Sequence, residues 1–177
     1  RQNREFTGVM EVRNEANDKM ISIRLSDELV PVCATILDRV KRLFDLQADP
    51  VAIHEVLGDL AAARPGLRVP GSFDGFEMAV RAILGQQISV AGASTLAGRF
   101  AAHFGTPISV PMTNLNYLFP PATRIAQAKA EEIQRLGITG QRAKTLIALA
   151  HSVADGSLHL EPGFRVDETL TTLRKIP

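Results

Sequence analysis

Two adjacent glutamines, Gln86 and Gln87, are the residues whose type and position best suit recognition chemistry. They follow the apolar run Ile83-Leu84-Gly85 and precede Ser89, a residue type that caps helices. The pattern predicts a helix interrupted at Gly85, a protruding turn, and a second helix that begins at Ser89. Amide side chains on such a turn can hydrogen-bond to base edges. A plain helix-helix connection with two exposed glutamines is the commoner meaning of this pattern.

Two basic residues, Arg142 and Lys144, form a second candidate site. We expect them in the first turn of a helix opened by Gly140, where outward-pointing backbone N–H groups can hold a phosphate. A surface helix with ordinary basic residues is the competing interpretation. The candidate DNA-binding set is therefore Gln86, Gln87, Ser89, Arg142 and Lys144.

The sequence offers no self-contained active site. Its histidines are scattered, and none pairs with another at the spacing of metal ligands: His54, His103, His151 and His159. Ser94 lacks the glycine two residues later that a nucleophile elbow requires. Glu131 and Glu132 point about 100° apart on a helix, which suits a solvated face. A single cysteine, Cys33, excludes an internal disulfide and a thiolate cluster built from this chain alone.

Composition indicates an ordinary globular chain. Of its 177 residues 45% are hydrophobic and 22% are charged, with 20 basic against 19 acidic residues. This balance neither favours nor excludes nucleic acid, because a local basic stripe can bind phosphates while acids elsewhere cancel it. No apolar run approaches the ~20 residues of a membrane span, and the first residues lack the apolar core of a signal peptide, so we expect a cytoplasmic protein. We also expect a monomer. The first residue is not Met and the last is Pro177, and we expect both ends to be cut.

The first third of the chain predicts an α+β arrangement. Residues 7–12 and 19–25 have extended, partly alternating apolar character and predict a hairpin. Ser26 is expected to cap an amphipathic helix that runs to Phe44. Asp49 and Pro50 predict a second helix that runs to about Ala62. The helix-breaking stretch 64–71 then places a domain boundary, giving domains 1–66 and 67–177.

The second domain has a purely helical pattern. Asp74 and Glu77 predict a capping box for a helix over 76–84. The pattern then predicts a helix from Ser89 to Phe104, a looser proline-containing segment, and helices over 123–137, 141–155 and 168–175. The fold class is therefore α+β: a small antiparallel sheet with helices, followed by an all-α helical bundle.

These segments resemble the AlkA-type DNA-3-methyladenine glycosylases of the helix-hairpin-helix superfamily. The resemblance extends over nearly the whole chain, through five separated segments in the right order: 42–46, 63–71, 76–90, 136–138 with 142–143, and 173–177. It implies a partial N-terminal α+β domain that lacks its first strands and a partial helix-hairpin-helix domain that grips DNA. It also implies base excision repair of alkylated purines in double-stranded DNA by a monofunctional hydrolase.

The resemblance implies that a Gly-hydrophobic-Gly hairpin begins at Ile176-Pro177 and holds a phosphate. A monovalent cation would be bound there, helped by the backbone carbonyls of Arg174 and Ile176. The catalytic aspartate is expected after Pro177, so this chain alone should be inactive. No cofactor is required for the chemistry, because an alkylated purine is a good leaving group and needs chiefly a flipped nucleotide and a carboxylate.

By position, the resemblance makes Gln87 the side chain that fills the hole left by the flipped base. A leucine is familiar at this position, so glutamine departs from the family pattern and is suited to pair with the orphaned base. Three alternatives stay open at the sequence level. They are a catalytically dead DNA-binding module, the C-terminal part of a fused alkylation-response regulator, and an oxidised-base glycosylase with a lysine nucleophile.

Overall fold

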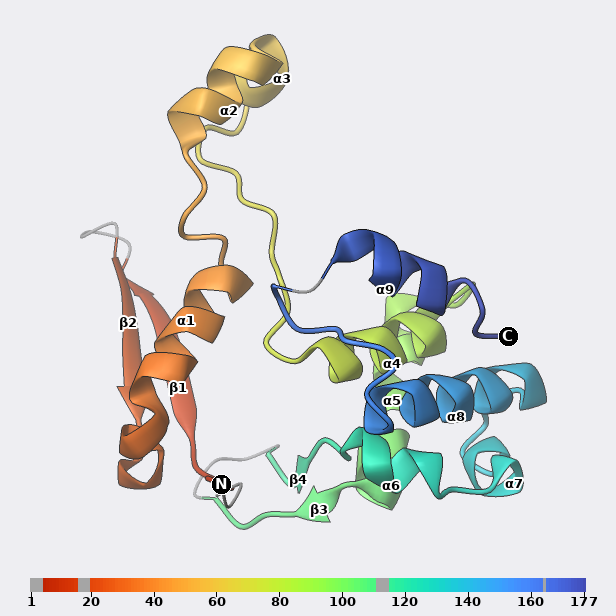
Figure 1. Ribbon diagram of the computed structural model, residues 1–177. Coiled ribbons are helices and arrows are strands. Elements are labelled where there is room, and N and C mark those ends of the chain that lie inside the picture. The colour runs from red at the N-terminus through yellow and green to blue at the C-terminus, as the bar shows by residue number, and fades with distance from the viewer. Residues whose placement is uncertain (1–4, 16–19, 111–114, 164) are drawn as a thin grey trace. The chain divides into compact units, whose positions relative to one another are not determined.

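The computed structural model describes residues 5–15, 20–110, 115–163 and 165–177, and these divide into two compact units. Unit 1 is Arg1–Phe73 and unit 2 is Asp74–Pro177 (Figure 1). The sequence placed the boundary earlier, between residues 66 and 67. The stretch up to Phe73 stays with unit 1 because Phe73 packs on its core and the Gly71 amide donates to the Leu43 carbonyl at 3.0 Å.

Unit 1 is built on an antiparallel hairpin of β1 (Met10–Glu15) and β2 (Met20–Leu25), with Met10 opposite Leu25. A 3-10 helix, η1 (Asp27–Val32), leads into α1 (Cys33–Leu43). Alternate strand residues pack on the buried side chains of the helical segment, which are Leu29, Ile36 and Val40. The small sheet with helices is therefore confirmed.

Two local predictions for unit 1 need correction. Ser26 lies at the N-cap of η1, as expected, but its side chain makes no capping hydrogen bond, and its hydroxyl instead accepts from the Val9 amide at 3.0 Å. The single helix predicted from Pro50 is divided into α2 (Pro50–Leu57) and α3 (Asp59–Ala62). Gly58 separates them with a φ of 51°, a left-handed conformation that glycine adopts at little cost. The Asp49 cap is confirmed, since its carboxylate accepts from the Val51 amide at 2.9 Å.

Unit 2 is mainly helical. Its helices are α4 (Gly75–Gly85), α5 (Val90–Phe104), α6 (Ala122–Ala126), α7 (Ala130–Gln134), α8 (Gly140–Ala154) and α9 (Val166–Leu173). Two short strands, β3 (Thr106–Pro107) and β4 (Tyr117–Leu118), pair antiparallel within the proline-containing segment. As Figure 1 shows, α8 lies against α4, α6 and α7, which it contacts.

The unit 2 core consists mainly of apolar side chains from α4, α5, α6, α7 and α8. Its fully buried members include Val80, Leu84, Phe100, Ile125, Ile133 and Leu146. The predicted caps of α4 and α5 are confirmed, with Asp74 accepting from the Glu77 amide at 2.8 Å and Ser89 from the Gly92 amide at 3.1 Å. The helix predicted over 123–137 is instead two short helices, α6 and α7. Within the described residues, no helix has the length and apolar content to span a bilayer.

A matched pair of valine substitutions tests this core. Val80→Ala should lower the free energy of unfolding of unit 2 by about 2 kcal/mol, because it removes two buried methyl-sized groups and leaves a cavity. Val166→Ala makes the same change at a side chain that is 69% exposed, against 0% for Val80. Val166→Ala should change the free energy of unfolding by no more than about 0.5 kcal/mol. Denaturant unfolding of both variants measures the difference, and equal effects would contradict the assigned core.

Candidate functional site

The turn between α4 and α5 has an unusual backbone. Gln86 has φ −59° and ψ 128°, and Gln87 has φ 53°. These angles follow the type II β-turn, whose third residue needs a positive φ and is usually glycine. A non-glycine residue in the left-handed region costs about 1–2 kcal/mol. The turn therefore stores strain at the residue predicted to contact DNA, and such strain is common at functional sites.

The helix end predicted at Gly85 is confirmed, since Gly85 is the last residue of α4. Gly85 itself has no positive φ, so the reversal of the chain does not depend on its conformational freedom. A Cβ built on it would meet the Ala93 Cβ at 3.7 Å, an ordinary contact distance. The chain leaves the helix at Gln86, and the reversal takes place at Gln87.

The turn is exposed along its whole length. Each residue from Gln86 to Val90 is exposed, and Val90 is 85% exposed although it is apolar. The Ser89 hydroxyl is engaged as the cap of α5, which fixes the direction in which the chain leaves the turn. The exposed side chains of Gln86, Gln87 and Ile88 thus stand between two capped, rigid helices.

Arg142 reaches this turn from α8. Its Nη2 donates a hydrogen bond to the carbonyl oxygen of Gln86. A hydrogen bond to a charged donor contributes about 1.5–3 kcal/mol, which is the same size as the strain at Gln87. The Arg142 backbone is itself held at the start of α8, because the Thr139 hydroxyl accepts from its amide at 3.5 Å.

Lys144 is not brought to the turn. It follows Arg142 by two residues, so it lies about 200° further around the helix. Its side chain is exposed, whereas that of Arg142 is half-buried. Four of the five predicted DNA-binding residues therefore lie at one turn-helix junction, and Lys144 lies on another face of α8.

The segment after α9 also contacts α8. The Thr145 hydroxyl lies within hydrogen-bond distance of two backbone oxygens, those of Pro177 and Gln141, the latter at 3.0 Å, and its single proton can be shared between them. Thr145 and Arg142 are three residues apart, so one face of α8 contacts both the α4-α5 turn and the 174–177 segment. Ile176 is half-buried against the unit 2 core.

The proposed cation site can be compared with this segment. The carbonyls of Leu170, Thr172 and Leu173 accept the hydrogen bonds that close α9, and the carbonyls of Arg174 and Ile176 come after this ladder. Carbonyl oxygens suit a hard cation, but hard cations such as Ca²⁺ take about six to eight oxygen ligands. Both carbonyls are therefore of the chemical type that such a site would need, and further oxygens would have to complete it.

Sequence reasoning missed the residues that organise the junction. Thr139 caps α8, and its position just before Gly140 was the available signal. Thr145 had no sequence signal, since it acts through a tertiary contact. Ile88 is apolar yet 38% exposed, and its exposure becomes evident only from the fold.

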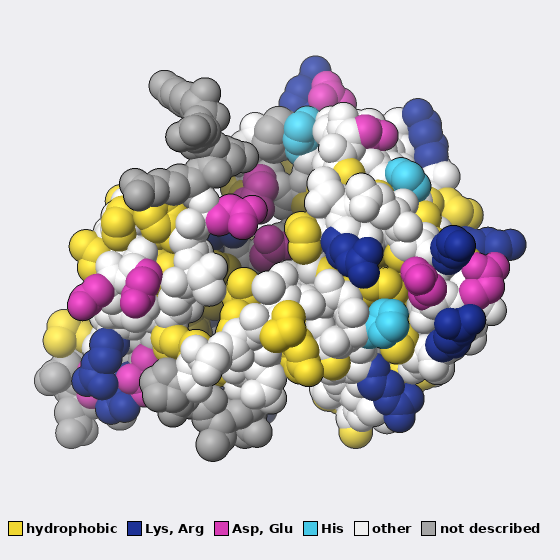
Figure 2. Space-filling model, turned by 90° about the horizontal axis from the view of Figure 1, so that it is seen from below, with side chains coloured by type: hydrophobic (Ala, Val, Ile, Leu, Met, Phe, Trp, Pro, Cys, Tyr) yellow, Lys and Arg dark blue, Asp and Glu magenta, His cyan; other side chains and the backbone are white. Residues whose placement is uncertain are grey.

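Charge elsewhere in the described residues does not indicate an active site. On the face seen in Figure 2, Lys and Arg side chains are interspersed with Asp, Glu and His side chains rather than gathered in one patch. No three His, Cys, Asp or Glu side chains come together as metal ligands in the part of the chain that the structure describes.

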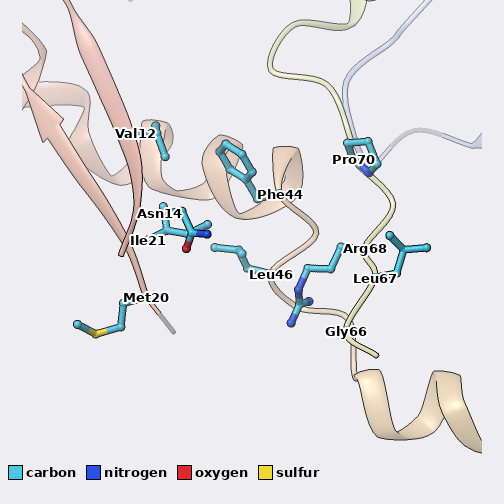
Figure 3. Close-up of a pocket in the computed structure, with 10 residues that line it drawn as sticks. All are labelled: Val12, Asn14, Met20, Ile21, Phe44, Leu46, Gly66, Leu67, Arg68 and Pro70. Carbon is cyan, nitrogen blue, oxygen red and sulfur yellow. The ribbon is translucent and has the colours of Figure 1, made fainter. Parts of the chain in front are cut away.

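A groove of about 760 Å³ lies within unit 1, between the hairpin, the end of α1 and residues 66–70 (Figure 3). Its lining is mostly apolar, and Arg68 is its one ionisable residue among the described lining residues. The Arg68 guanidinium donates to the carbonyls of Asp45 and Ala48, at 2.5 Å and 3.1 Å. Arg68 therefore has a structural task, and this groove offers no acid or base for catalysis.

Comparisons with known proteins agree with the organisation in two units. Residues 2–74 match the AlkA N-terminal domain, and residues 80–175 match the HhH-GPD superfamily of base excision DNA repair proteins. DNA-3-methyladenine glycosylase 2 of Escherichia coli (strain K12) is 39% identical over 175 residues, which are 98% of this chain and 61% of that protein. The chain thus spans about three-fifths of that relative.

Two further matches are informative. A probable bifunctional transcriptional activator/DNA repair enzyme AlkA of Mycobacterium tuberculosis (strain ATCC 25618 / H37Rv) is 42% identical over 135 residues, covering 73% of this chain and 27% of that protein. The Clostridium acetobutylicum 8-oxoguanine glycosylase/lyase, solved with double-stranded DNA, superposes with a TM-score of 0.68 at 19% identity, over 94% of this chain and 57% of that one. Because residues 80–175 are more than half of the chain and include the turn, α8 and α9, the chain belongs to the HhH-GPD superfamily of base excision DNA repair proteins.

Proposed function

We propose that the protein containing this chain is a DNA glycosylase that hydrolyses the N-glycosidic bond of alkylated purines such as 3-methyladenine. The strained, exposed turn at Gln87, held from α8 by Arg142, is the observation that carries this proposal. Family membership and the 39% identity to an E. coli protein named for this activity support it. Its partner would be double-stranded DNA with alkylated bases.

In this proposal, Gln87 enters the duplex where the damaged nucleotide leaves. The energetic cost of extruding a base is a few kcal/mol, and a side chain that replaces the lost contacts favours the extruded state. The glutamine amide has both donors and an acceptor, so it can hydrogen-bond to the orphaned base. Ile88, exposed beside it, adds apolar surface for contact with neighbouring bases.

Phosphates would be held by helix ends rather than by a broad basic face. The first turns of α5 and α8 contain no acidic residue, so their N–H groups stay attractive to anions. Lys144 would add a point charge on α8, away from the turn. This arrangement is compatible with a net charge of only +1.

The chain's own residues would bind and distort DNA, while the carboxylate that stabilises the oxocarbenium-like sugar would come from a segment after Pro177. We propose no cofactor for the chemistry. A monovalent cation would be bound by the carbonyls of Arg174 and Ile176 together with further oxygens, and it would supply positive charge near a phosphate. We expect a cytoplasmic monomer.

A second arrangement remains supported by one observation, the M. tuberculosis relative whose name joins a transcriptional activator to a DNA repair enzyme. The same glycosylase unit would then be the C-terminal part of a fused regulator. The sequence before Arg1 distinguishes the two arrangements.

Base release tests the proposed activity. The full-length protein should release free 3-methyladenine from alkylated duplex DNA, because it would combine the DNA-holding turn with a carboxylate. A polypeptide of residues 1–177 should release none. Chromatography of released bases, against a no-protein control, measures both. Absence of release by the full-length protein would overturn the glycosylase proposal, and release by the verified 1–177 polypeptide would overturn the assignment of the carboxylate to a later segment.

Gln87→Ala in the full-length protein tests the role of the turn. Affinity for a duplex with an abasic site should fall by roughly 1–3 kcal/mol, the scale of one lost base contact or stacking platform. Thermal stability should change by less than about 0.5 kcal/mol, since the exposed alanine keeps the Cβ and therefore the same backbone strain. Melting and abasic-DNA binding are measured side by side.

The exposed glutamine Gln47 of unit 1 supplies the matched control, Gln47→Ala, which should change neither quantity. Unchanged affinity of the Gln87→Ala protein together with lowered stability would show that Gln87 only supports the turn.

A further inference from the structure

One hydrogen bond connects α8 to the peptide that carries the backbone strain. The carbonyl oxygen of Gln86, which accepts from Arg142, belongs to the same peptide plane as the amide of Gln87. The orientation of this plane sets ψ of Gln86 and φ of Gln87, which are 128° and 53°. By binding the Gln86 carbonyl, Arg142 therefore restrains φ of Gln87, the strained angle.

The alternative turn differs by a flip of this one peptide. In a type I turn the third residue has a negative φ, which suits glutamine better than the type II conformation does. The flip would turn the Gln86 carbonyl away from its present direction and would break its bond to Arg142. A fixed donor at this carbonyl thus selects the strained turn.

The donor is fixed because α8 is fixed. Ala143 and Leu146, beside Arg142 on α8, are completely buried, and α8 contacts α4, the helix that ends at this turn. The Thr139 cap holds the first turn of α8. The guanidinium is planar and presents its donors in a rigid geometry.

We propose that Arg142 is a positioning residue: by holding the Gln86 carbonyl, it keeps Gln87 in the left-handed conformation that presents its side chain to DNA. This assigns Arg142 a task different from the phosphate contact expected from its place at a helix N-terminus. The test by DNA affinity rests on the proposed function, whereas the test by the free energy of unfolding rests on the geometry of the turn alone.

A double-mutant cycle in the full-length protein separates positioning from phosphate binding. The variants are Arg142→Ala, Gln87→Ala and both together, with Lys144→Ala as the control that removes one charge from the same helix. Affinity for an abasic duplex and for an unmodified duplex is measured at several salt concentrations. Arg142→Ala should weaken abasic binding by roughly 5- to 150-fold, as loss of the Gln87 contact would.

With a positioning role, Gln87→Ala should cause almost no further loss once Arg142 is alanine, and the salt dependence of binding should be unchanged. A phosphate contact predicts additive losses on both duplexes and a slope of log affinity against log salt reduced by about 1. Either of those results for Arg142→Ala would overturn the proposal. Lys144→Ala should lower the affinity for the abasic duplex and for the unmodified duplex by the same factor.

A stability measurement keeps the test valid even if the protein does not bind DNA. Glycine adopts positive φ freely, so Gln87→Gly should stabilise the parent protein, in which Arg142 holds the strained turn, more than it stabilises the Arg142→Ala protein, in which the turn can relax. Equal effects of Gln87→Gly in the two backgrounds, measured by denaturant unfolding, would overturn the positioning role. Absence of DNA binding by the parent protein would instead overturn the proposed function.

Discussion

Burial of the apolar side of α8 is the constraint on which the rest of unit 2 depends. Ala143, Leu146, Leu149 and Ala150 are buried there, and the helix contacts α4, α6 and α7. Burial of this kind contributes about 25 cal/mol per Å² of apolar surface, and it leaves α8 no freedom to rotate. Its other face is then fixed as well, so Arg142 meets the α4-α5 turn and Thr145 meets the end of the chain.

The strained turn is a consequence of that arrangement. In an isolated peptide, Gln87 would be expected to leave the left-handed region, because no local interaction compensates the cost of a positive φ. In the folded unit, the compensating donor comes from 56 residues further along the chain. A rigid core can therefore maintain a conformation that the local sequence disfavours, and an exposed side chain gains a defined direction without itself being packed.

The separation in sequence between the partners of a contact explains which features the sequence could predict. Asp49, Asp74 and Ser89 cap their helices as expected because a cap depends on residues two or three positions away. Ser26 is a serine like Ser89, but its hydroxyl accepts a hydrogen bond from the Val9 amide, 17 residues earlier in the chain. The Gln86–Gln87 turn could be located from the helix pattern, whereas its anchor on Arg142 could not, because the contact depends on how α8 packs. The sequence pattern led instead to a phosphate role for that arginine.

The same reasoning accounts for the division of labour in the proposed enzyme. In the proposed function, unit 2 would hold a duplex while one nucleotide leaves it, and such holding would depend on fixed donors more than on a high net charge. Helix N-termini provide such donors at no cost in net charge, since their partial charge comes from the backbone. A chain with 20 basic and 19 acidic residues would therefore be able, in the proposed function, to hold DNA at a few defined points.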